Sequence, residues 1–73
     1  MDDDRAYAIR AFYRLYQATC AVALDPQHAG ARQAQRTAAY RAHTALREAG
    51  LLELPKERLF ELVRANHPAF GRS

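Results

Sequence analysis

Residues 4–24 read DRAYAIRAFYRLYQATCAVAL and contain neither Gly nor Pro. Apolar side chains recur along this stretch at the period of a helix and form a broad stripe. Arg10, Arg14 and Gln17 recur at the same period on the opposite face. The stretch therefore predicts a long amphipathic helix, whose apolar stripe consists of Ala8, Ile9, Phe12, Leu15, Tyr16, Thr19, Val22 and Ala23.

A second helix is predicted over residues 26–49. Asp25 and Pro26 interrupt the first helix, and they suit the N-cap and the first position of a new one. Gly30 leaves open a later start near Ala31, because glycine disfavours the first turn of a helix. Both starting points leave only a short connection, which favours an antiparallel hairpin of the two long helices.

The end of the second helix carries a clearer signal. Gly50 is placed to adopt the left-handed conformation that closes a helix, with Leu51 in contact with Leu46. One narrow face of this helix carries only methyl groups, which allow close approach to the larger side chains of the first helix. That face consists of Ala31, Ala34, Ala38, Ala42, Ala45 and Ala49.

A third, shorter helix is predicted over residues 55–66. Pro55 suits its first position, Asn66 could close it in the left-handed conformation, and Pro68 prevents its continuation. Residues 69–73 are expected to fray. One side of this helix is apolar and carries Leu59, Phe60, Leu62 and Val63.

These elements predict an all-α protein, a long antiparallel helical hairpin with a short third helix, in a single domain over residues 1–73. The stability margin of a domain of this size is thin, so self-association is a reasonable expectation. The aromatic stripe around Phe12 and Tyr16 has two interpretations. Either two hairpins pair into a dimeric helical bundle, which we expect, or the third helix covers the stripe within a monomer.

Length and charge narrow the function classes. A chain of 73 residues has no room for a nucleotide-binding sheet or a two-lobed cleft. The formal net charge is +3, and three of the eight acidic residues are Asp2, Asp3 and Asp4, so the rest of the chain is more basic. Alanine and arginine are both very frequent, and biased codon usage produces the same excess. Arginine content alone is therefore weak evidence for nucleic-acid binding.

The sequence predicts neither a catalytic centre nor a bound cofactor or metal. Cys20, His28, His43 and His67 lack the spacing of ligands presented from one element. A single cysteine cannot form an internal disulfide, which fits a reducing compartment. No apolar run is long enough to span a bilayer, and the acidic first residues are unlike a secretory signal. We expect a cytoplasmic protein without a membrane association.

Arginine and tyrosine gather on helix faces that the apolar stripes leave exposed. Arg with Tyr is the composition of protein-binding hot spots, and a basic row with an aromatic ring can also follow phosphates. The alternative is a solvated face in an arginine-biased composition. The predicted partner-binding residues are Arg32, Arg36, Tyr40, His43 and Arg47 on the second helix, with Tyr7, Arg10 and Arg14 on the first.

Residues 45–52, ALREAGLL, resemble the end of the recognition helix in winged helix-turn-helix regulators. In that family a leucine, a capping glycine and an apolar pair lead into a two-stranded wing. Here Pro55 and a third helix follow instead, and the preceding segment is one long Ala-striped helix. The chain is therefore not assigned to the family.

We expect a non-catalytic interaction module, an adaptor or inhibitor that binds a partner protein through these Arg- and Tyr-bearing faces. The alternative is a nucleic-acid-binding transcriptional regulator that uses the basic face of the second helix. The same residues serve both hypotheses, so the sequence does not separate them.

Overall fold

The computed structural model describes residues 2–71, with Asp2 described by its backbone alone. Three helices make up this part of the chain: α1 (Asp2–Leu24), α2 (Ala29–Glu48) and α3 (Lys56–Asn66). Residues 2–71 contain no strand, so the prediction of an all-α fold is confirmed. None of these helices combines the length and the apolar character that a bilayer span requires.

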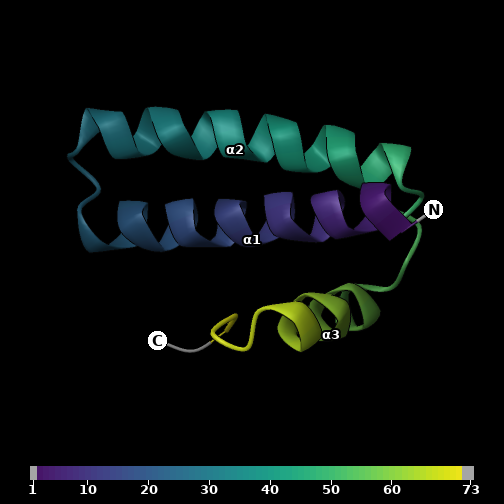
Figure 1. Cartoon of the computed structure of the whole chain (residues 1–73). Helices are drawn as coiled ribbons and strands as arrows, with labels where there is room; N and C mark the ends of the chain where they lie inside the picture. The colour runs from purple at the N-terminus through teal and green to yellow at the C-terminus, as the bar shows by residue number, and fades with distance from the viewer. Residues whose placement is uncertain (1, 72–73) are drawn as a thin grey trace.

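α1 lies between the other two helices (Figure 1). It packs against α2 to form the predicted antiparallel hairpin, and against α3 on another side. No Cα atom of α2 lies within 8 Å of one in α3, so α1 supplies the contacts that join the helices. At about 1.5 Å per residue, α3 is roughly 16 Å long and α1 roughly 34 Å, so α3 covers only part of α1.

α2 begins at Ala29, later than the predicted start at residue 26. The chain turns through Pro26 and Gln27, and the His28 amide donates to the Asp25 carbonyl at 3.1 Å. His28 then serves as the N-cap, because its Nδ1 accepts a hydrogen bond from the Ala31 amide at 2.9 Å. The prediction of a start at Pro26 is wrong because an imidazole, rather than Asp25, supplies the capping acceptor.

The end of α2 has the predicted Schellman motif. Gly50 adopts φ +73°, and its amide donates to the Arg47 carbonyl at 3.1 Å. The Leu51 amide donates to the Leu46 carbonyl at 2.8 Å, and both leucine side chains are buried. The turn reverses the chain at the end of α2 and directs it toward the opposite side of α1, where α3 lies.

α3 begins at Lys56, with Pro55 as its N-cap rather than as its first residue. The Pro55 carbonyl accepts hydrogen bonds from the Arg58 and Leu59 amides. Asn66 does not adopt the left-handed conformation, since no described residue other than glycine has a positive φ. Its side chain donates instead to the Leu62 carbonyl at 2.9 Å, so Asn66 remains the last helical residue.

The expected fraying of residues 69–73 is wrong for Phe70, which is only 7% exposed. The chain turns after α3, where the Phe70 amide donates to the His67 carbonyl at 2.9 Å. This turn returns the Phe70 ring to the aromatic stripe of α1. The apolar area that the ring buries offsets the entropy of ordering a terminal segment. Arg72 and Ser73 lie outside the described residues.

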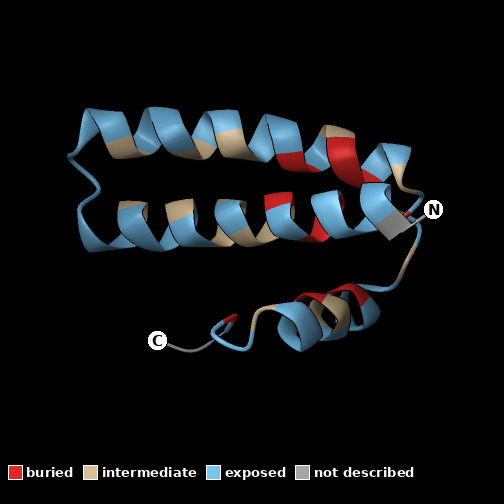
Figure 2. Ribbon diagram, in the orientation of Figure 1, coloured by how far each residue is buried: buried red, intermediate tan, exposed pale blue. Residues whose placement is uncertain are grey.

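The buried residues concentrate at one end of the hairpin, where all three helices are present (Figure 2). Toward the α1–α2 turn the helices are mostly exposed, and Leu24 is 88% exposed. The aromatic stripe of α1 had two interpretations, a dimeric bundle or coverage by the third helix. Within the chain, α3 lies against this stripe, as the second interpretation predicts. The core consists of Ala8, Ile9, Ala11, Ala42, Ala45, Leu46, Leu51, Leu59, Val63 and Phe70.

Candidate functional site

The predicted partner-binding residues of the second helix all lie on the exposed outer surface of α2. Tyr40 is 75% exposed, so nearly its whole ring is open to solvent. Arg36 donates a long hydrogen bond of 3.4 Å to Gln33 Oε1 on the same helix. This surface, here called the outer face of α2, consists of Arg32, Arg36, Tyr40, His43 and Arg47.

The three predicted residues of the first helix occupy a different place. Tyr7, Arg10 and Arg14 line a groove of about 370 Å³ between α1 and α2. Arg10 and Arg14 are each two residues from Phe12, which contacts the α3 ring of Phe60. Two residues correspond to roughly 200° around a helix, so the groove opens on the side of α1 away from α3.

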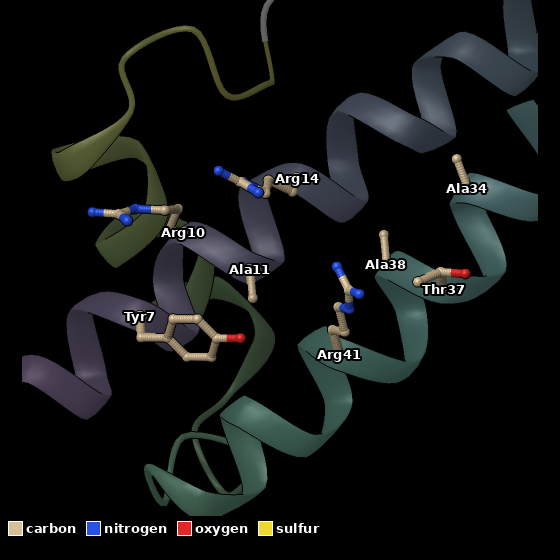
Figure 3. A pocket seen from close by; sticks show the side chains of 8 residues that line it. All are labelled: Tyr7, Arg10, Ala11, Arg14, Ala34, Thr37, Ala38 and Arg41. Carbon is tan, nitrogen blue, oxygen red and sulfur yellow. The ribbon is translucent and has the colours of Figure 1, made fainter.

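The groove has an apolar floor and a basic rim (Figure 3). Ala11, Ala34 and Ala38 contribute methyl groups to the floor, because small side chains let the two helices approach closely at this place. The Tyr7 ring extends from α1 toward α2, and Arg41 extends from α2 toward α1. The groove is lined by Tyr7, Arg10, Ala11, Arg14, Ala34, Thr37, Ala38 and Arg41.

The sequence reasoning missed Arg41 and Thr37, which line the groove from α2. The signal was present in the helical period, because Arg41 follows Ala38 by three residues and Thr37 by four. Arg41 therefore lies beside the alanine face rather than on the outer face of α2. The basic residues of α2 thus lie on two surfaces. Most are on its outer face, and Arg41 lines the groove together with the arginines of α1.

Within the described side chains, Arg10, Arg14 and Arg41 take part in no ion pair or hydrogen bond. The groove lining contains no acidic residue. Like charges that gather without a counter-charge repel each other, and an anion at this place would relieve that repulsion. Guanidinium groups bind carboxylates and phosphates through paired hydrogen bonds, so the groove favours such groups.

The opposite side of α1 carries an aromatic cluster that is closed by packing. The Phe70 ring lies 5.8 Å from Phe12, 4.8 Å from Tyr16 and 5.4 Å from Phe60, measured between centroids. Tyr13 stacks on the imidazole of His67 at 4.3 Å with the planes nearly parallel. These contacts are those of a core, and they place no free polar group in a cavity.

Burial, followed by a hydrogen bond with the Cys20 side chain, raises the pKa of the Tyr16 phenol above its ordinary value. Cys20 itself is exposed and forms no disulfide. No group of three or more His, Cys, Asp or Glu residues within the described part of the chain is arranged to hold a metal ion.

Comparison with protein-family models, with curated proteins and with solved structures finds no match for this chain.

Proposed function

We propose that the chain is a small helical interaction module, an adaptor or inhibitor without catalytic activity, which binds a partner protein through the α1–α2 hairpin. The observation that carries this proposal is the exposure of all eight Arg, Tyr and His residues that the sequence singles out. Tyr7 is 57% exposed and Tyr40 is 75% exposed. Large rings and arginines in such positions are the groups that dominate binding energy at protein interfaces.

Site-specific photo-crosslinking in the cells that make the protein tests this proposal. A benzophenone side chain replaces Tyr40 or Tyr7, and a third variant carries it at Glu57 on α3 as a control. We expect a defined protein adduct from a tyrosine position but not from the control. The adduct should disappear when charge is reversed on both faces together, by Arg10→Glu and Arg14→Glu on α1 with Arg36→Glu and Arg47→Glu on α2. Absence of a protein adduct from both tyrosine positions contradicts the proposal.

Nucleic-acid binding is the second candidate, and the shape of the outer face of α2 favours it. The row from Arg32 to Arg47 extends for roughly 22 Å along the helix, and the only acidic residue of α2 is Glu48. A row of this kind can follow the phosphates of a backbone. Affinity for DNA or RNA should then fall steeply with salt, and Arg36→Glu with Arg47→Glu should abolish it. Absence of binding at low salt excludes this candidate.

We propose self-association of the chain, but not through the aromatic stripe of α1. The dimeric bundle was predicted from an uncovered aromatic stripe on α1, and α3 with Phe70 occupies that stripe. We therefore propose that a homodimer would use another surface of the chain. Light scattering behind a size-exclusion column gives the mass directly, and a species near twice 8.3 kDa is the result expected of a dimer.

We propose a reducing compartment, the cytoplasm, as the location. Cys20 is an exposed free thiol, which an oxidising environment would convert into a cross-link or an adduct.

A further inference from the structure

The groove between α1 and α2 carries positive charge from both helices. Arg10 and Arg14 are one helical turn apart on α1 and extend away from α2, whereas Arg41 extends from α2 toward α1 (Figure 3). No acidic side chain lines the groove, and none of those described pairs with these arginines. The three guanidiniums therefore offer their hydrogen-bond donors to a ligand rather than to the protein itself.

The rest of the lining adds apolar contact and two hydroxyls. Ala34 and Ala38 present methyl groups, Tyr7 presents a ring with its phenol, and Thr37 presents a hydroxyl at the edge. In protein interfaces, charged anchors bind most strongly where neighbouring apolar contacts exclude water. The groove has a volume of about 370 Å³, which is close to the lower end of the range for ligand sites. This volume fits a few side chains of a partner.

We propose that this groove, rather than the outer face of α2, is the recognition centre, and that it binds an acidic segment of the partner protein. The inference rests on the proposed function, because it names the chemistry of the partner. Side-chain carboxylates of the segment pair with Arg10, Arg14 and Arg41, and its methylene groups lie on the alanine floor. The Tyr7 ring covers one side of the bound segment.

The arrangement favours a peptide over a nucleic acid. Nucleic-acid binding draws its affinity from many phosphate contacts spread along the backbone. The groove carries three cations along its rim, two from α1 and one from α2, with methyl groups between the helices. The extended basic row lies elsewhere, on the outer face of α2. A short acidic peptide can place two or three carboxylates in the groove without further contacts along the hairpin.

An NMR titration of the whole chain with capped hexaglutamate tests the inference, with hexaglutamine as the uncharged control peptide and hexathymidylate as the nucleic-acid probe. The largest amide shifts with hexaglutamate should fall in residues 7–14 and 34–41. Arg14→Gln with Arg41→Gln should weaken this binding by about tenfold or more, because hydrogen bonds to charged groups are lost. Arg32→Gln with Arg47→Gln removes the same charge outside the groove and should weaken it less than about threefold.

A second pair of variants separates shape from charge. Ala34→Leu fills the groove without changing the charge, whereas Ala39→Leu adds the same side chain at an exposed position outside it. We expect the first to weaken hexaglutamate binding and the second to leave it unchanged, with both proteins folded by circular dichroism. Equal effects of the two, or equal losses from the two arginine pairs, overturn the groove as the recognition centre. Tighter binding of hexathymidylate than of hexaglutamate in the groove also overturns it.

Failure of this inference is distinguishable from failure of the proposed function. The photo-crosslinking variant at Tyr40 is repeated with Arg14→Gln and Arg41→Gln in the same chain. If the protein adduct persists undiminished, the proposed function stands and the groove is not its centre. If neither tyrosine position gives a protein adduct when the groove arginines are intact, the proposed function fails, regardless of the result of the hexaglutamate titration. Loss of the adduct only in the groove variant supports both.

Discussion

α1 packs against its two neighbours by different means. Toward α3 and the C-terminal segment it presents large rings, and Phe12 and Tyr16 contact Phe60 and Phe70 with centroids 4.8–6.0 Å apart. Toward α2 it presents small side chains, and Ala8 and Ala11 meet the alanines of α2. Packed rings fill the centre of the first side, although a hollow of about 490 Å³ lies between Arg5 of α1 and Arg58 and Glu61 of α3. The second side leaves a groove along its edge.

The difference shows what each kind of contact provides. Rings bury a large area per residue, so a short helix and one terminal phenylalanine suffice to close their side of α1. Methyl groups bury little, but they bring two long helices close together over several turns. Side chains at the edge of such a contact have no large neighbour to pack on, so the arginines and Tyr7 remain available to a ligand.

Among the changes that test this difference, removal of the Phe70 ring should lower the free energy of unfolding most. Phe70→Ala deletes a ring that contacts Phe12, Tyr16 and Phe60, and it should lower the free energy of unfolding by about 3 kcal/mol. Urea denaturation followed by circular dichroism measures the change. Leu24→Ala is the matched control, because Leu24 is 88% exposed and its loss should cost less than about 0.5 kcal/mol. Equal effects of the two variants would show that the C-terminal segment is not docked.

An enlarged side chain on the α2 side should have the next largest effect. Ala42 is 1% exposed, and Ala42→Leu should force the two long helices apart at a cost of about 2 kcal/mol. Ala39→Leu adds the same group at an exposed position of α2 and should change stability by less than about 0.5 kcal/mol. Thermal unfolding compares the two proteins. A tolerated leucine at position 42 would contradict close packing through methyl groups.

A smaller effect is expected at the turn that directs the chain from one side of α1 to the other. Gly50 has φ +73° and no atom within 4 Å of an added Cβ, so only backbone strain opposes a side chain. Gly50→Ala should therefore cost about 1 kcal/mol. Gly50→Asn should cost less, because asparagine tolerates the left-handed conformation. Chemical denaturation of both variants checks the order, and an equal or reversed order would argue against this cap.

The smallest expected effect is on the pH dependence of the free energy of unfolding, through Tyr16 on the side of α1 that carries the rings. The pKa of the Tyr16 phenol is raised by burial, so the folded state binds this proton more tightly than the unfolded state does. Its stabilising contribution is therefore complete below the unfolded pKa of about 10, and it is lost as pH rises through the folded pKa. The free energy of unfolding should fall more steeply between about pH 9 and 11 in the wild type than in Tyr16→Phe. Identical slopes would contradict the raised pKa.

Local sequence was sufficient for the three helices, for the last residues of α1 and α3 at Leu24 and Asn66, and for the cap that ends α2. The period of the apolar residues predicts α1 and α2, and the position of Gly50 predicts the motif that ends α2. Where a cap depended on an unusual side chain, the prediction was wrong, as at His28. Caps of this kind escape a sequence reading because imidazole is an uncommon acceptor at that position.

The candidate site was only partly within reach of the sequence. The helical period identified Arg10 and Arg14 as one face, but it did not indicate that Arg41 would face them from α2. That pairing depends on the register and rotation of two helices, which the packing of Ala8 and Ala11 of α1 and of Ala42 and Ala45 of α2 in the core helps to decide. The sequence reading consequently placed the candidate arginines of α2 on its outer face and passed over Arg41, which lines the groove.

By itself, the sequence determined that the chain is helical, where two long helices run, and that a glycine closes the second, because periodicity and backbone preference are local properties. The tertiary structure alone decided that α3 lies on the ring side of α1, that Phe70 is buried rather than frayed, and that three arginines from two helices share one groove. Each of these depends on contacts between residues far apart in the chain, whose net stability arises only when the packed elements bury their surfaces together.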